Sequence, residues 1–249
     1  MNRDIQKLAS RQLHDYRTNN PGTCFKDPEF ILNMRDAYEL QARVTKLRVV
    51  EGESVIGYKV GCTGPGTIKQ FGMDGPIRGT LFSNEARQTG AQLKASAFTN
   101  LAIEGEMAVT IGDDGEIASA FPVIELHNYI FRAPVKNLPE LIANNGFNAG
   151  VILPKLRWQQ STQYINQFAQ LTVKINSKFM GSGDLWPHHG GPLGSINWLK
   201  NNLTEFGLSF SSKQMILAGT ALGLYPVKSG DTIDVYINEQ LAVTCNIEI

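Results

Sequence analysis

Apolar side chains recur at helical spacing near the start of the chain. Ile5, Leu8, Ala9, Leu13 and Tyr16 fall on one side of a predicted helix, because positions three and four residues apart share a helix face. That face is available for packing against a core.

A second helix is predicted after the chain-breaking sequence Asn-Pro-Gly at residues 20–22. Asn33 is suited to cap its first turn, because an asparagine side chain accepts a hydrogen bond from a backbone N–H two or three residues later. Apolar residues then follow at helical intervals until Gly52 ends the helix. We expect residues 1–53 to form a helical segment that packs on a core built by residues 54–249.

From residue 54 the pattern changes to short apolar and alternating runs, which are typical of strands. The longest run covers residues 101–111, and the Gly-Asp-Asp-Gly sequence at residues 112–115 predicts a turn into a returning strand at residues 116–121. One helix is predicted at residues 196–206, with Gly207 just after its end. Many strands with few helices between them favour an α+β fold with a mixed β core over a doubly wound sheet. The other predicted strands cover residues 55–60, 80–82, 123–130, 149–153, 171–175 and 215–218 and a hairpin at residues 233–245.

Composition narrows the classes of partner. Among 249 residues, 23 basic side chains balance 23 acidic ones, so no bulk field favours nucleic acid or an anionic membrane. No run approaches the roughly 18 apolar residues of a membrane span, and residues 1–7 lack the apolar core of a signal peptide. We therefore expect a cytoplasmic chain with no nucleic-acid or membrane partner. The three cysteines, Cys24, Cys62 and Cys245, have the spacing of neither a disulfide framework nor a zinc ribbon.

Two glutamates lie inside the longest predicted strand, in the sequence Glu104-Gly105-Glu106. Alternation places Gly105 on one face and both glutamates on the other, with their Cα atoms about 6.5–7 Å apart. A bare Glu-x-Glu pair is more often a solvated strand edge. Glu125, however, is a third carboxylate inside an apolar run, where it is costly without a partner. Three such carboxylates suit a hard divalent cation, Mg²⁺ or Mn²⁺, which keeps positions open for water and substrate oxygens.

Lys59 stands in a short apolar strand between Gly57 and Gly61. Taken alone, such a lysine more often extends its ammonium group to the surface. Beside a bound dication the ammonium would instead be destabilised, which suits a proton shuttle or an anchor for an anion. Both interpretations stay open at this level.

Other motifs point away from familiar chemistries. The six glycines between residues 61 and 79 precede no Lys-Ser/Thr pair of a phosphate-binding loop, and we expect a loop with a short helix at residues 67–71. His188 and His189 would point in opposite directions on a strand and have no third ligand nearby in the sequence, so we expect a loop there too. Neither Gly-x-Ser-x-Gly nor His-Glu-x-x-His occurs in the chain.

Short motifs follow one another in a characteristic order. They include Gly-Tyr-Lys-Val-Gly-Cys-Thr at residues 57–63, Ile-Glu-Gly-Glu-Met-Ala at residues 103–108 and Val-Ile-Glu-Leu at residues 123–126. Further motifs lie at residues 73–76, 79–82, 191–199, 206–207 and 215–219. Taken together, they resemble the vinylpyruvate hydratase and 4-oxalocrotonate decarboxylase branch of the fumarylacetoacetate hydrolase superfamily. The resemblance begins near Asp36 and covers nearly the whole chain.

The resemblance implies an α+β fold with a mixed β-roll or barrel-like core, of the fumarylacetoacetate hydrolase C-terminal-domain type, and with amino-terminal and flanking helices. It also implies one Mg²⁺ or Mn²⁺ per subunit on Glu104, Glu106 and Glu125, with Lys59 as the catalytic residue that moves a proton. The implied activity is that of a hydratase in the breakdown of aromatic compounds. Such an enzyme ketonises a small 2-hydroxy-2,4-dienoate and adds water to the 2-oxo-4-enoate, usually as a homo-oligomer.

The chain departs from the family pattern near this implied site. The family's acid in a Pro-Asp-Phe-Gly stretch is replaced by Ile77, with Arg78 beside it. The Ser-Arg pair that follows the third carboxylate in the family is Tyr-Ile at residues 129–130. Gly219-Thr220, in contrast, is similar to the hydrolase branch, whose Gly-Thr pair contacts substrate.

We expect Arg78, Leu81 and Thr220 to bind substrate, and Arg78 is suited to a second carboxylate of a diacid. The departures leave three alternatives to hydration. They are decarboxylation of a 2-oxo diacid, hydrolysis of a C–C bond in an acylpyruvate, and a catalytically impaired relative that only binds a small oxo acid.

Overall fold

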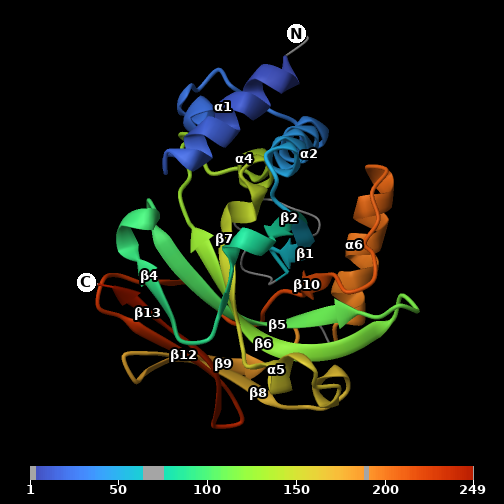
Figure 1. Cartoon of the computed structure of the whole chain (residues 1–249). Helices are drawn as coiled ribbons and strands as arrows, with labels where there is room; N and C mark the ends of the chain where they lie inside the picture. Colours follow the sequence, from blue (N-terminus) through green and yellow to red (C-terminus); the bar gives the residue numbers. More distant parts are fainter. Residues whose placement is uncertain (1–3, 64–75, 188–190, 249) are drawn as a thin grey trace.

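The computed structural model of the chain describes residues 4–63, 76–187 and 191–248. The short helix expected at residues 67–71, the motif at residues 73–76 and the pair His188–His189 lie outside these residues, wholly or in part. Helices α1 (Ile5–Arg17), α2 (Met34–Val50) and α4 (Leu138–Ala143) gather at one end of the molecule, as Figure 1 shows.

The two amino-terminal helices begin and end where the sequence predicts. The side chain of Asn33 accepts a hydrogen bond of 2.8 Å from the backbone N–H of Asp36, which satisfies one of the free donors in the first turn of α2. Gly52 follows the helix with a φ of +97°, a conformation that costs glycine little. The helices bury Leu40 and Phe25 together with Ile142 of α4 in a core of their own.

A curved mixed sheet carries most of the strands. Its order is β2-β1-β10-β5-β6-β7-β3, and β11 pairs with β5. These strands are β1 (Val55–Gly61), β2 (Ile77–Phe82), β3 (Ala86–Gln88), β5 (Leu101–Ile111), β6 (Ile117–Asn128), β7 (Asn148–Leu153), β10 (Met215–Leu217) and β11 (Tyr225–Pro226).

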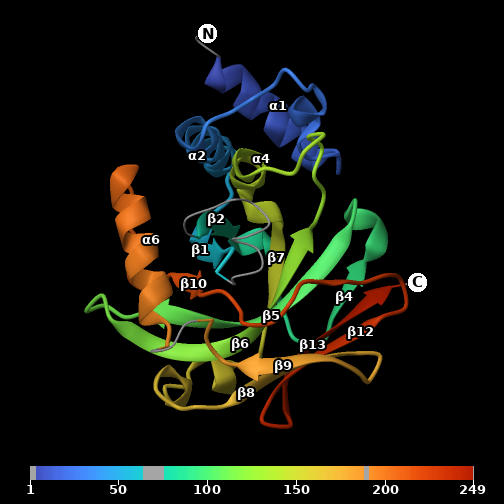
Figure 2. The same cartoon turned by 180° about the vertical axis from the view of Figure 1, so that it is seen from behind.

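A second sheet lies at the opposite end from the amino-terminal helices, and Figure 2 shows it from behind. Its order is β4-β13-β12-β8-β9. Helix α6 (Leu193–Glu205) stands beside the first sheet, and Gly207 after it has a φ of +68°. The strands are β4 (Ala91–Lys94), β8 (Gln170–Ile175), β9 (Lys178–Asp184), β12 (Thr232–Ile237) and β13 (Gln240–Glu248). The shorter helices are α5 (Leu156–Gln159) and the 3₁₀ turns Thr23–Lys26, Ser83–Glu85, Ala95–Ala97, Asn145–Phe147 and Gln163–Ile165.

The two sheets meet at Gly105. A Cβ atom there would lie 2.5 Å from Val173 of β8 and 3.2 Å from Val235 of β12, so only a glycine lets the valines pack against β5. This contact fixes which face of β5 is the core face. By strand alternation, Glu104 and Glu106 lie on the opposite face, as the sequence predicts.

The strands predicted at residues 116–121 and 123–130 are wrong as two elements, because β6 runs unbroken through Pro122. Pro122 pairs with Met107 of β5, whereas the pairing of β6 with β7 begins only at Ile124. Pro122 therefore lies where β6 has a strand neighbour on one side only. Its missing N–H group costs no hydrogen bond between strands there. None of the helices in the described ranges is both long and apolar enough to cross a membrane.

Candidate active site

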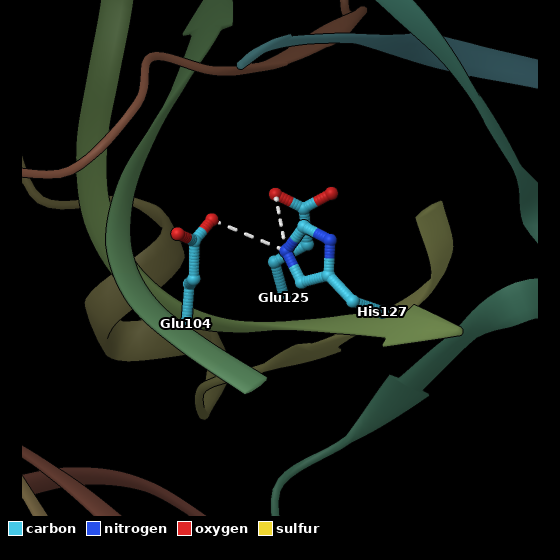
Figure 3. Close-up of side chains that lie close together, drawn as sticks. All are labelled: Glu104, Glu125 and His127. Atoms are coloured by element: carbon cyan, nitrogen blue, oxygen red, sulfur yellow. Dashed lines mark ion pairs between the residues drawn. The ribbon is translucent and has the colours of Figure 1, made fainter. Parts of the chain in front are cut away.

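The centre of the candidate site is formed by β5 and β6. Glu104 pairs with Glu125 across the two antiparallel strands, and His127 lies two residues beyond Glu125 on the same face. Figure 3 shows the imidazole between the two carboxylates. Its Nε2 atom lies 3.1 Å from Oε2 of Glu104 and 3.4 Å from Oε2 of Glu125. One donor atom from each of the three residues lies within 4.8 Å of the others.

The surroundings of Glu125 and His127 determine the ionisation of both side chains. Burial alone would raise the pKa of Glu125, but His127 and Lys59, with a hydrogen bond from Asn148, lower it to about 2. Burial alone would lower the pKa of His127, but Glu125 and Glu104 raise it above its usual range. Each group therefore favours the charged form of the other.

Glu106 lies beside this cluster and is 1% exposed. Burial, followed by the negative charges of Glu125 and Glu104, holds the pKa of Glu106 well above its usual range. Its Oε1 atom has no hydrogen-bond partner among the described residues. Within the described ranges, the site therefore contains a buried carboxylate oxygen that no donor reaches.

Lys59 extends into the same cluster from β1 and does not reach the surface, since it is only 2% exposed. Its Nζ atom lies 2.9 Å from Oε1 of Glu125 and donates to the carbonyl oxygen of Gly146 at 3.1 Å. Burial alone would lower the pKa of Lys59, but the carboxylates of Glu125, Glu104 and Glu106 raise it overall. The ammonium form is thus the resting form beside the glutamates.

Glycines make room for the lysine side chain. A Cβ atom at Gly79 or at Gly146 would lie 2.8 Å from a carbon of Lys59, and one at Gly61 would lie 3.3 Å from it. Ile77, which replaces the family's acid, is buried beside the Lys59 side chain. Its Cδ1 atom would lie 3.2 Å from a Cβ atom placed on Gly146. No ionisable side chain stands at that position.

The predicted substrate-binding residues are not gathered at one place. Thr220 lies against the glutamate strand, where its hydroxyl donates to the carbonyl oxygen of Gly105 at 2.8 Å and accepts from the backbone of Leu222 at 3.0 Å. Leu81 shares a face of β2 with Gly79 and is buried in the larger core.

The structure does not bring Arg78 together with the glutamates. Arg78 and Gly79 are neighbours on β2, and Gly79 faces Lys59, so the arginine side chain points to the opposite face. Its Nη1 atom donates to Asn202 of α6 at 2.9 Å, and its guanidinium lies 4.8 Å from the ring centre of Tyr38 on α2. In this position Arg78 links two helices to the sheet.

Two residues of the cluster are not among those predicted from the sequence. Asn148 donates to Oε1 of Glu125 at 2.8 Å, but nothing in the sequence connects it to a glutamate 23 residues earlier. His127 does carry a signal, because its i+2 spacing from Glu125 in an apolar strand places both side chains on one face.

The residues present fit a divalent cation. Three carboxylates lie around Lys59 and His127, and within the described residues Oε1 of Glu106 is buried without a donor. Carboxylate oxygens are the ligands that hard divalent cations prefer. A doubly charged cation would give Glu106 the positive partner that it otherwise lacks there and would favour its ionised form.

Comparison with known proteins agrees with this fold. No family model matches the chain. It is 25% identical to the 2-hydroxyhexa-2,4-dienoate hydratase of Comamonas testosteroni, over 87% of this chain and 86% of the relative. It is 24% identical to the 2-oxo-hept-4-ene-1,7-dioate hydratase of Escherichia coli, over 86% of each chain.

Among solved structures, the fold is similar to that of 4-oxalocrotonate decarboxylase from Pseudomonas putida G7, complexed with magnesium and adipate. The TM-score is 0.85 at 21% sequence identity, over 98% of this chain and 97% of that one. The chain thus has an α+β fold in which a curled sheet holds a buried acidic centre. This is the fold of the fumarylacetoacetate hydrolase superfamily, and the predicted resemblance to its hydratase and decarboxylase branch is confirmed.

Proposed function

We propose that the protein is a divalent-metal-dependent hydratase of small 2-hydroxy-2,4-dienoates, which it converts through the 2-oxo-4-enoate by adding water. The observation that carries the proposal is that Lys59, Glu106 and Glu125 are buried together, with the partly exposed Glu104 beside them. The relatives support it, because the first two are named as hydratases and align with most of the chain.

In this proposal Glu104, Glu106 and Glu125 hold the cation, Mg²⁺ or Mn²⁺. The cation supplies Lewis-acid chemistry toward the carboxylate and the 2-oxygen of an oxo acid. The carboxylates differ in how they are held: Glu125 is fixed by Asn148 and Lys59, whereas the side chain of Glu104 is 20% exposed.

Lys59 moves the proton. Its ammonium group is buried and is held by Glu125 and the carbonyl of Gly146. A charged Nζ atom donates a proton to a dienol carbon, and the neutral amine that results is stabilised by burial. The 2-hydroxyl proton that the dienol loses on becoming a ketone restores the ammonium form of Lys59, and the hydroxyl group and proton of water then add across the remaining C=C bond.

The activity is tested by incubating the protein and Mg²⁺ or Mn²⁺ with 2-hydroxypenta-2,4-dienoate. We expect loss of the dienol absorbance and a product that has gained one water, detected by mass spectrometry. Release of CO₂ from a 2-oxo diacid without hydration would reassign the chain as a decarboxylase. Unchanged absorbance across dienoates of several chain lengths would overturn the proposal.

Lys59→Met provides the test of the proton step. Methionine has a similar length and no charge, so we expect the cation to bind and turnover to fall by about 10²-fold or more, the usual contribution of proton transfer. The matched control is Lys178→Met, because Lys178 is exposed on β9 and should leave turnover unchanged. Wild-type turnover in Lys59→Met would remove Lys59 from the reaction.

A further inference from the structure

We infer that His127 binds the cation directly through Nε2, as a nitrogen ligand beside Glu104 and Glu125, and that it shifts the metal preference of the site from Mg²⁺ toward Mn²⁺. The inference rests on the proposed function only in so far as that function requires a divalent cation. It goes further, because the predicted ligand set contains oxygen donors alone.

The position of the imidazole carries the first step. His127 is 4% exposed, and its Nε2 atom lies 3.1 Å and 3.4 Å from one oxygen of each glutamate. Nevertheless, Nε2 makes no hydrogen bond of acceptable geometry within the described part of the chain. Figure 3 shows this nitrogen facing one oxygen of Glu104 and one oxygen of Glu125, each joined to it by a dashed ion-pair line.

These separations match a coordination sphere. Donor atoms that bind a cation at about 2.1 Å lie about 3 Å apart when they are adjacent and about 4.2 Å apart when they are opposite. Nε2 lies 3.1 Å and 3.4 Å from one oxygen of each glutamate, which is close to the separation of adjacent donors. One donor atom from each of the three residues lies within 4.8 Å of the others.

The remaining contacts of Glu125 support the same assignment. Its Oε1 atom already receives Asn148 at 2.8 Å and Lys59 at 2.9 Å. The other oxygen, Oε2, is the one that faces His127. The protein thus saturates one oxygen with its own donors and leaves the second, together with the imidazole, facing the position of the cation.

A nitrogen ligand changes which cation binds best. Mg²⁺ favours oxygen donors and gains little from imidazole, whereas transition-metal ions bind imidazole well. Mn²⁺ accepts both donor types, so a site with two or three carboxylates and one histidine favours Mn²⁺ over Mg²⁺ more strongly than a site with carboxylates alone.

The test uses electron spin-echo spectroscopy of the protein loaded with Mn²⁺, without substrate. A directly bound imidazole gives a ¹⁴N modulation, and we expect it in the wild type and in His14→Gln, whose histidine is exposed on α1. We expect His127→Gln to lose the modulation. Calorimetry should show that this variant weakens Mn²⁺ binding by about 10- to 100-fold and Mg²⁺ binding much less.

Labelling with ¹⁵N-histidine keeps the inference testable if His127→Gln does not fold, because the modulation in the wild type must then change to that of ¹⁵N. Tight Mn²⁺ binding without nitrogen modulation would overturn the inference and leave the proposed hydratase intact. Nitrogen modulation in a protein that converts no dienoate would support the inference and overturn the hydratase. Absence of Mn²⁺ binding alone would overturn the inference, and absence of both Mn²⁺ and Mg²⁺ binding would overturn both.

Discussion

The side chain of Lys59 is held in place chiefly by residues that have no side chain of their own. The tightest contact is at Gly79, where a Cβ atom would lie 2.7 Å from the carbonyl oxygen of Asn145 and 2.8 Å from Cγ of Lys59. A backbone oxygen on one side and the lysine stem on the other leave no free space. The position of the ammonium group therefore depends on a glycine that carries no chemistry itself.

We expect Gly79→Ala to displace Lys59 and to destabilise the fold by about 1–3 kcal/mol, the usual cost of an overpacked site. Turnover should fall at the same time, because Nζ moves away from Glu125. The matched control is Gly223→Ala, where the nearest atom to the new Cβ would be 3.8 Å away. Urea unfolding and the dienoate assay check both variants, and a Gly79→Ala protein with wild-type turnover would contradict this account of Lys59.

Two cysteine side chains show how burial controls reactivity at single residues. Burial raises the pKa of Cys24 and of Cys245 to about 12. Since the thiolate is the reactive form, both thiols stay protonated and unreactive at pH 8. We expect iodoacetamide to leave Cys24 and Cys245 unmodified in the native protein and to label them after denaturation. Rapid native labelling of either residue, located by peptide mapping, would contradict the buried environment.

Single elements differ in how well the sequence predicts them. The strand at β5 is predicted with its observed bounds, because strict alternation runs into a turn sequence at residues 112–115. β3 and β4 have only three and four residues and pair with β7 and β13, which lie far away in the sequence. Such strands depend on tertiary partners, and no local pattern predicts them.

The residues of the candidate site also differ in how well the sequence predicts them. The three glutamates stand out in the sequence because a carboxylate in an apolar strand requires a partner. Arg78 also stands out beside the missing family acid, but the alternation of β2 directs it to the other face, toward Asn202. The side of the sheet on which a residue lies depends on strand register. A sequence motif gives the order of the residues but not this register.

Gly105 connects the packing of two sheets to the orientation of the glutamates. Gly105→Ala would bring a Cβ atom within 2.5 Å of Val173, so β5 must shift and the variant should lose about 1–3 kcal/mol of stability. Val173→Ala removes the methyl group that clashes. We therefore expect the double variant to be more stable than the sum of the single effects by at least about 0.5 kcal/mol. Urea unfolding of all four proteins measures the coupling, and strict additivity would show that the sheets do not meet at this contact.

At the scale of the whole molecule, the site joins segments that are distant in the sequence. β1 supplies Lys59, the hairpin of β5 and β6 supplies the glutamates, and β7 supplies Asn148. The cluster holds three carboxylates with Lys59 and His127, and one carboxylate, that of Glu106, is buried with an oxygen that has no donor among the described residues. Burying this group without a partner costs stability that a bound cation would restore, so metal binding and folding stability are linked.

Glu106→Gln tests this link, because it replaces a buried ionisable group with a neutral amide and also removes a predicted metal ligand. Without metal, we expect the variant to melt at a higher temperature than the wild type. At 100 times the dissociation constant, Mn²⁺ should stabilise the wild type by about 2.7 kcal/mol, which corresponds to roughly 5–10 °C in a chain of this size. The variant should gain much less at the same Mn²⁺ concentration.

Differential scanning calorimetry with and without Mn²⁺ measures both effects, and Glu116→Gln is the control because Glu116 is exposed in the hairpin turn. If Glu106→Gln gained as much from Mn²⁺ as the wild type, Glu106 would not be a ligand. If it melted at a lower temperature without metal, the carboxylate would be a satisfied structural group. A higher melting temperature without metal, together with a lost response to Mn²⁺, would show that Glu106 binds the cation and that its carboxylate destabilises the metal-free protein.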